Sequence, residues 1–213
     1  MAEIGAFSLK DGTPETFRSP GYPLILAVPF MVDLSVFTYA LIINTFFLLL
    51  NALYAFRLTL ILGFTKGVGQ VASLFVLASP TLLFYQHQVL SELPFSAVLT
   101  ISLYYFFRFV KERSFQYLLL SMGLLICSVY VKPIAIYLVY LFPVVAIFLI
   151  GIRRQDTISK NLQAFGPILA IGLLGWYSIH AWETRNYKVA DVREFSTVKS
   201  FNLNQYITAP IVA

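Results

Sequence analysis

The sequence predicts an all-α protein, a polytopic bundle of transmembrane helices with one interfacial helix and part of an outer loop. Of its 213 residues, 59% are apolar and only 12% are charged, whereas a soluble domain carries about 25% charged residues. A surface in water needs more charge than this, so the lipid bilayer is the solvent that suits the chain. Aromatic residues make up 16% of the sequence, which is typical of helices with rings at the membrane interface.

Six apolar runs are candidate membrane spans, since a helix of about 20 residues crosses the hydrocarbon core. The third run is short, and Lys132 and Pro133 divide the fourth from the fifth, because a residue before proline tends to leave the helix. A briefer apolar run, 24–31, predicts an interfacial or re-entrant helix, with a bend at Asp33. We treat residues 1–213 as one membrane-embedded domain. The predicted spans are 35–56, 68–86, 94–109, 115–131, 133–151 and 164–183.

Basic residues in alternate connections predict the orientation, because short cytoplasmic loops collect Lys and Arg. The opposite connections, the loop 86–93 and the turn at Lys132, contain one basic residue, Lys132. We therefore expect the N-terminal segment, these two connections and the segment after Glu183 on the outer side. This pattern predicts a multi-pass membrane protein, and we expect it in the cytoplasmic membrane of a prokaryote with its active side facing outward. The basic connections contain Arg57 and Lys66, then Arg108, Lys111 and Arg113, then Arg153, Arg154 and Lys160.

Charge and cysteine content exclude several other classes of protein. The net charge of +5 is better explained by loop orientation than by nucleic acid, so no nucleic-acid partner is expected. The single cysteine, Cys127, allows no internal disulfide. His180 and Glu183 share a helical face, but two ligands do not make a metal site. We therefore predict no metal site, and the sequence leaves the need for any cofactor, including a divalent cation, undetermined.

Two outer-side residues each have a structural and a functional interpretation. Glu92 follows Ser91 and precedes Pro94, so it suits the first turn of a capped helix, where the helix dipole favours a carboxylate. The same carboxylate is a candidate general base. Lys132 is a candidate phosphate ligand, although a lysine at a helix end also extends to the interface without any ligand.

Three motifs together resemble integral-membrane glycosyltransferases of the GT-C type, and most nearly the family-39 branch. That branch includes protein mannosyltransferases and lipid A aminoarabinose transferases. Residues 18–23, R-S-P-G-Y-P, are similar to a signature that follows their first outer loop. Residues 88–95 resemble the acidic second outer loop, and residues 182–187, W-E-T-R-N-Y, resemble a run that leads into a later outer loop.

The resemblance implies transfer of a sugar from a polyprenyl-phosphate donor to a glycan, lipid or protein acceptor at the outer face of the membrane. By this resemblance Glu92 is the catalytic acid of the second loop. Six residues would bind substrate, namely Arg18 and Arg185 as cations, Lys132 beside the departing phosphate, Tyr22 and Trp182 as walls, and Asn186 next to Arg185.

The sequence also departs from this family. The resemblance implies a principal catalytic aspartate ahead of the R-x-P-G-Y-P signature, but only Glu3, Asp11 and Glu15 precede Arg18. We therefore expect a truncated part of a larger enzyme that is inactive alone.

The alternative functions are a transporter or flippase module for a lipid-linked or anionic solute, and a catalytically dead remnant. A transporter is expected to place ionisable residues at mid-membrane in repeated segments, and no repeat is visible.

Overall fold

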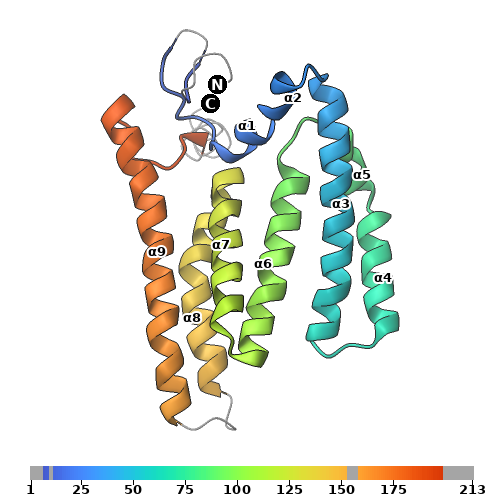
Figure 1. Ribbon diagram of the computed structural model, residues 1–213, viewed down its shortest axis with the longest axis vertical. Helices are drawn as coiled ribbons and strands as arrows, with labels where there is room; N and C mark the ends of the chain where they lie inside the picture. Colours follow the sequence, from blue (N-terminus) through green and yellow to red (C-terminus); the bar gives the residue numbers. More distant parts are fainter. Residues whose placement is uncertain (1–6, 10–11, 153–157, 199–213) are drawn as a thin grey trace, which may run out of the picture.

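The computed structural model describes residues 7–9, 12–152 and 158–198, and its regular structure in these ranges is helical apart from one isolated bridge between Ser8 and Pro14. The predicted all-α class is therefore confirmed. Five long helices run roughly side by side (Figure 1), and they are α3 (Val36–Ile61), α6 (Glu92–Glu112), α7 (Phe115–Val131), α8 (Ile136–Ile152) and α9 (Ile158–Ala190).

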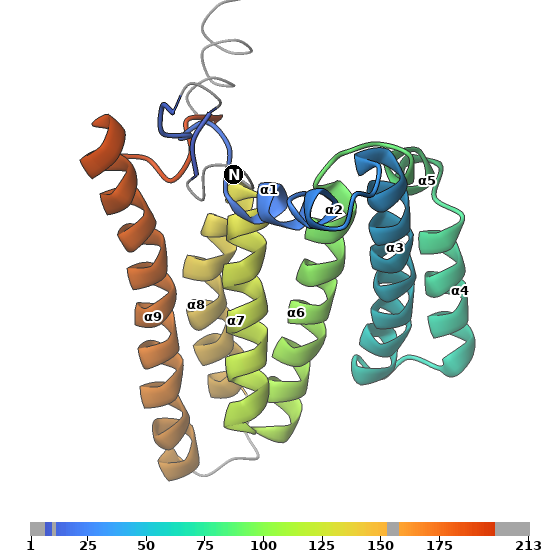
Figure 2. The ribbon, with the colours of Figure 1, turned by 45° about the horizontal axis from the view of Figure 1, so that its top comes forward.

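Shorter helices complete the bundle. Helices α4 (Lys66–Leu77) and α5 (Pro80–Gln86) form a bent pair beside α3, and the 3-10 turn η1 (Pro133–Ala135) leads into α8. Helices α1 (Gly21–Ile25) and α2 (Val28–Met31) lie across one end of the bundle (Figure 2), where the short apolar run predicted an interfacial helix. Asp33 follows with φ of 51°, so the predicted bend lies at this residue.

Three helical segments are long and apolar enough to span a membrane, namely Val36–Ile61, Glu92–Glu112 and Pro133–Ile150. The pair α4 and α5, bent by 50°, makes a fourth if it is one broken span. The described residues therefore indicate a multi-pass membrane protein with three to four candidate spans by length and composition. The other two predicted spans coincide with α7, which has 17 residues, and with part of α9, which has 33.

The connections alternate between the two ends of the bundle as the sequence predicts. Residues 12–20, the loop 87–91, the turn at Lys132 and the segment 191–198 lie at one end, which we call the outer end (Figure 1). The turns 62–65 and 113–114 lie at the opposite, inner end. These names follow the predicted membrane orientation.

Buried polar side chains join the helices between the two ends. Asn51 of α3 donates to the Ser96 hydroxyl at 3.0 Å and accepts from the Thr100 hydroxyl at 2.8 Å, so both the nitrogen and the oxygen of its side-chain amide bond to α6. Ser102 of α6 and Ser121 of α7 each donate to the other's backbone carbonyl, at 2.8 and 2.9 Å. Hydrogen bonds of this kind hold helices together in lipid, where burial of apolar surface drives association only weakly.

The N-terminal segment packs closely on the outer end of α7. The Ser19 hydroxyl donates to the Val131 carbonyl at 3.1 Å. A Cβ atom on Gly21 would lie 2.6 Å from the Tyr130 carbonyl oxygen and 2.9 Å from the Val131 nitrogen. Backbone atoms cannot move aside as a flexible side chain can, so this approach requires glycine at position 21.

We expect Gly21→Ala to destabilise the fold by about 1 to 3 kcal/mol, the usual range for overpacking. Gly123→Ala is the matched control, because a Cβ there meets no atom within 4 Å and alanine favours the interior of a helix by up to about 1 kcal/mol. Thermal unfolding of both variants in detergent measures the difference. Equal melting temperatures would contradict the close packing of Gly21.

The predicted orientation is tested by labelling cysteines in a Cys127→Ser background. His87 lies in an outer-end loop and Lys66 at the inner end, and both are exposed. In intact cells, an impermeant maleimide should label His87→Cys directly and Lys66→Cys only after permeabilisation. The reverse pattern would place the inner end outside and contradict the orientation.

Candidate functional site

An ion pair joins two of the predicted site residues at the outer end. Lys132 Nζ lies 2.9 Å from Glu92 Oε1, and 37% of the lysine side chain and 28% of the glutamate side chain are exposed. Glu92 is in the first turn of α6. Lys132 ends α7 with an extended backbone, φ of −147° and ψ of 115°, as expected for a residue before proline. The turn at Lys132 therefore connects α7 to the neighbouring helix α8, which runs in the opposite direction, and leaves the lysine facing the start of α6.

The start of α6 shows how Ser91 and Glu92 are placed. The Ser91 side chain makes no capping hydrogen bond, so the predicted serine cap is absent. Glu92 does occupy the first turn, where the helix dipole stabilises it. Its bond to Lys132 bridges 40 positions in the sequence, which a role confined to the helix end does not require.

Tyr22 of α1 lies close to this pair and stays neutral over the ordinary pH range. Burial, and then the negative charge of Glu92, raise the pKa of Tyr22 from 10.0 to about 12. The Tyr22 hydroxyl and Glu92 Oε2 are both buried, and neither has a hydrogen-bond partner. One oxygen is an available donor and the other an available acceptor beside the same ion pair.

A cleft of about 1010 Å³ opens at this end of the bundle, with walls from α1, α2, the end of α7 and the loop before α6. Its polar lining includes Arg18, Tyr22, Ser91 and Lys132, and Glu92 bonds to the lysine in that wall. Its apolar lining includes Leu9, Phe17, Pro23, Leu26, Ala27, Phe30, Val89, Leu90, Val131, Pro133 and Val198. The cleft thus combines two cations with an extended apolar surface.

Glu15 shapes the loop that carries Arg18. Its Oε1 accepts hydrogen bonds from the backbone N–H groups of Phe17, at 2.7 Å, and Arg18, at 3.2 Å. These bonds fix the turn before α1 and place Arg18 on the wall of the cleft. Glu15 is therefore a structural residue here.

The W-x-x-R-N-Y motif on α9 lies apart from the lining of the cleft and binds the two outer segments. Arg185 donates to the carbonyls of Phe7 at 3.1 Å and Glu15 at 3.2 Å. Its guanidinium also lies 5.0 Å from the Trp182 ring centre, a favourable cation–π distance. Arg185 thus uses its N–H groups to hold the N-terminal segment.

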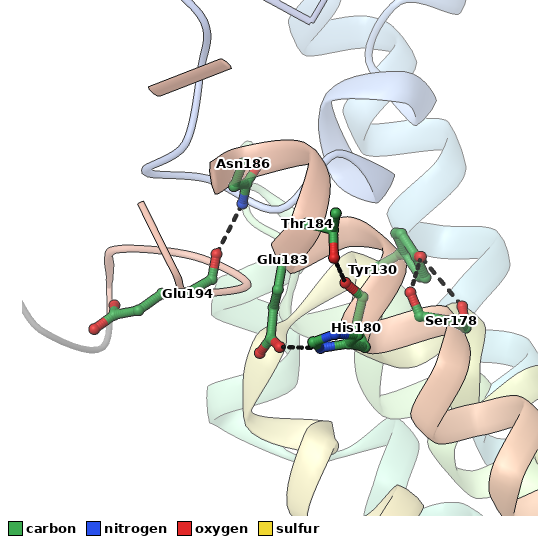
Figure 3. A network of polar contacts seen from close by, with 7 residues as sticks. All are labelled: Tyr130, Ser178, His180, Glu183, Thr184, Asn186 and Glu194. Carbon is green, nitrogen blue, oxygen red and sulfur yellow. Dashed lines mark hydrogen bonds and ion pairs between the residues drawn. The ribbon is translucent and has the colours of Figure 1, made fainter. Parts of the chain in front are cut away.

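Asn186 and Trp182 hold the segment after α9 in the same way. Asn186 is fully buried and donates to the carbonyls of Glu194, at 2.9 Å, and Phe195, at 3.1 Å. Trp182 Nε1 donates to the Phe195 carbonyl at 3.1 Å. Figure 3 shows Asn186 reaching from the end of α9 to the returning chain at Glu194.

The structure therefore divides the predicted site residues into two groups. Arg18, Tyr22, Lys132 and Glu92 come together at the cleft, whereas Trp182, Arg185 and Asn186 organise the segments around it. Sequence reasoning missed Ser196, which lines the cleft and donates to the Phe17 carbonyl. No motif contains Ser196, so only the returning path of the chain reveals its position.

No metal site is visible in the part of the chain that the structure describes, where no three His, Cys, Asp or Glu side chains gather around one point. His180 Nδ1 lies 3.5 Å from Glu183 Oε2 on the side of α9 (Figure 3), and 57% of the histidine side chain is exposed. These two residues form a surface pair.

Comparison of the chain with models of known protein families, with curated proteins and with solved structures finds no match. The resemblance to membrane glycosyltransferases therefore depends on the three sequence motifs alone.

We expect the raised pKa of Tyr22 to be visible in alkaline stability. Below pH 10 this tyrosine is neutral in both the folded and the unfolded chain. Between pH 10 and about pH 12 the unfolded chain releases the proton and the folded chain keeps it, so stability falls as the pH rises. The melting temperature of Tyr22→Phe should therefore fall less over this window than that of the wild type. Parallel curves would contradict the raised pKa.

Proposed function

We propose that this chain is part of a membrane glycosyltransferase, which moves a sugar from a polyprenyl-phosphate donor to an acceptor at the outer face. The observation that carries the proposal is the Glu92–Lys132 ion pair beside a cleft that also contains Arg18 and Tyr22. For the alternative of a transporter or flippase, the described residues offer the break between α4 and α5, but no cluster of charged side chains lies beside that break.

The cations of the cleft suit the phosphate of the donor. Arg18 offers a planar group that can bind two phosphate oxygens, and Lys132 offers a compact ammonium. Negative charge develops on the lipid phosphate when its bond to the sugar breaks, and preorganised positive charge stabilises that state. As phosphate approaches, it competes with Glu92 for Lys132 and releases the carboxylate toward the acceptor.

Glu92 suits the role of general base for the acceptor. Once separated from Lys132, its carboxylate can take the proton of an acceptor hydroxyl or amine as that group attacks the sugar. Tyr22 stays neutral and can donate a hydrogen bond to the sugar, the phosphate or Glu92 itself. The buried oxygens of Tyr22 and Glu92, both without a partner, provide these positions.

The apolar part of the cleft suits the polyprenyl chain. It is lined by Leu26 and Ala27, which join α1 to α2, and by Phe30 of α2. Phe30 is 65% exposed and the adjacent Met31 is 81% exposed, so the apolar surface continues out of the cleft. Burial of a hydrocarbon chain on such a surface is favourable, by about 0.8 kcal/mol for each CH₂ group.

Donor binding by the full chain in nanodiscs tests the proposal. We expect a photoreactive polyprenyl-phosphate sugar to bind, and Lys132→Met or Arg18→Gln to weaken binding about 10- to 100-fold, because a hydrogen bond to a charged group contributes about 1.5 to 3 kcal/mol. Arg193→Gln is the control, since Arg193 is exposed at the outer end and stacks on Tyr187 at 4.4 Å, away from the cleft.

Sugar transfer and lipid translocation are measured in the same preparation. We expect binding without sustained transfer, because the resemblance implies a further aspartate that the sequence lacks. In a longer, active enzyme that contains this segment, Glu92→Gln should lower the turnover of sugar transfer by about 10²- to 10⁴-fold. Donor binding that ignores Lys132 and Arg18 would contradict the proposal, and translocation of the donor across liposomes would favour the flippase alternative.

A further inference from the structure

At the inner end of the bundle, tyrosines and arginines from three helices form one connected group, which we call the inner cluster. Tyr54 of α3 packs edge-on against Tyr104 of α6 at 5.3 Å, and Tyr105 stacks on Tyr117 of α7 at 6.1 Å. Tyr104 and Tyr105 are 5.2 Å apart, so the rings form a continuous layer. The members of the inner cluster are Tyr54, Arg57, Tyr104, Tyr105, Arg108 and Tyr117.

The two arginines lie over this layer of rings. The Arg57 guanidinium is 5.3 Å from the Tyr54 ring centre, and that of Arg108 is 4.1 Å from the Tyr117 ring centre. A guanidinium that stacks by its face keeps its N–H edge available for an anion.

The arginines differ in how their charge is balanced. Arg108 donates to both oxygens of Glu112, at 2.9 and 3.3 Å. Arg57 is exposed and has no carboxylate partner among the residues that the structure describes. Arg57 therefore offers an unneutralised cation next to a neutralised one.

Both arginines lie at the same depth. Arg57 is four residues before the end of α3, and Arg108 is four residues before the end of α6, which is about 6 Å along each helix. Helix α6 has 21 residues and a length of about 31 Å, close to the hydrocarbon thickness of about 30 Å. The arginine backbones are thus about 6 Å inside the inner boundary of the hydrocarbon core, a depth from which long arginine side chains extend to the level of the lipid phosphates.

The neighbouring charges and the surface of α3 also suit a lipid. The stretches 57–66 and 108–114 contain one acid, Glu112, among their basic residues. Leu49 and Leu53 are 56% and 42% exposed and precede Arg57 at intervals of four positions, so they lie in a row on one face of α3. An acyl chain can follow this row while its phosphate lies at Arg57.

We infer that the inner cluster binds the phosphate of an anionic glycerophospholipid in the adjacent leaflet, with Arg57 as the principal ligand. A basic site between helices at the cytoplasmic side is suited to anionic head groups. The exposed row of Leu49 and Leu53 on α3 can contact an acyl chain, which favours a lipid over free phosphate. This site is at the opposite end from the cleft and does not depend on the proposed function.

The test compares the association of spin-labelled phosphatidylglycerol and spin-labelled phosphatidylcholine with the full chain in phosphatidylcholine liposomes. We expect wild-type protein to prefer phosphatidylglycerol and Arg57→Gln to lower that preference about fivefold, which corresponds to about 1 kcal/mol for one basic residue at the surface. Glu112→Gln should raise the preference, because it releases Arg108. Arg193→Gln, at the outer end, should leave it unchanged.

The opposite effects of Arg57→Gln and Glu112→Gln separate lipid binding from a general loss of folding, which would lower the preference in both variants. Equal affinity of the wild type for the two lipids would overturn the inference. A preference that Arg57→Gln leaves intact would overturn it too. Displacement of the labelled phosphatidylglycerol by inorganic phosphate would replace the lipid with a free anion and would also overturn it.

Discussion

The outer end of the molecule depends on the contact between the N-terminal segment and the C-terminal end of α7. Ser19 bonds to the Val131 carbonyl, and Gly21 lies so close to Tyr130 that no side chain fits between them. This contact places Arg18 and Tyr22 on either side of Ser19 and Gly21, facing the turn that carries Lys132. Without it, α1 and α2 would have no fixed position across the bundle, and the cleft would lose a wall.

The cations at the outer end have different tasks because their surroundings differ. Lys132 bonds to the Glu92 carboxylate, and about a third of the lysine side chain is exposed, so an incoming anion can compete for the ammonium group. Arg185 donates to backbone carbonyls and stacks on Trp182, and release of these bonds would leave partly buried polar groups without these partners. A cation held in this way positions the chain around the cleft and is a poor candidate for contact with substrate.

Much of the fold could be predicted from the sequence, since apolar runs mark each long helix and Lys132-Pro133 marks the turn between α7 and α8. The alternation of the connections followed from the same runs. The division of the site residues could not be predicted. Glu92 and Lys132 are 40 positions apart, and Arg185 and Glu15 are 170 positions apart, so their partners depend on the packing of α6, α7 and α9. Arg18 and Arg185 have the same side chain and are predicted on the same side of the membrane, so the sequence analysis expected the same role for both. Only the structure distinguishes them, because Arg18 lines the cleft and Arg185 bonds to backbone carbonyls.

The distribution of charge along the helices bears on the choice between transfer and transport. In the long helices α3, α6, α7 and α8, every Asp, Glu, Lys and Arg lies within five residues of a helix end, as Arg57, Glu92 and Arg108 illustrate. The mid-bundle polar residues are neutral, and Asn51 with Thr100 and Ser102 with Ser121 bond across helices. Transporters commonly carry ionisable groups or broken helices near the midplane; these four helices have no charged residue there, and the break between α4 and α5 is the one feature of this kind among the described residues. Chemistry at a membrane face needs charge at that face alone, and under the proposed function the Glu92–Lys132 pair would supply a carboxylate base and a cation there.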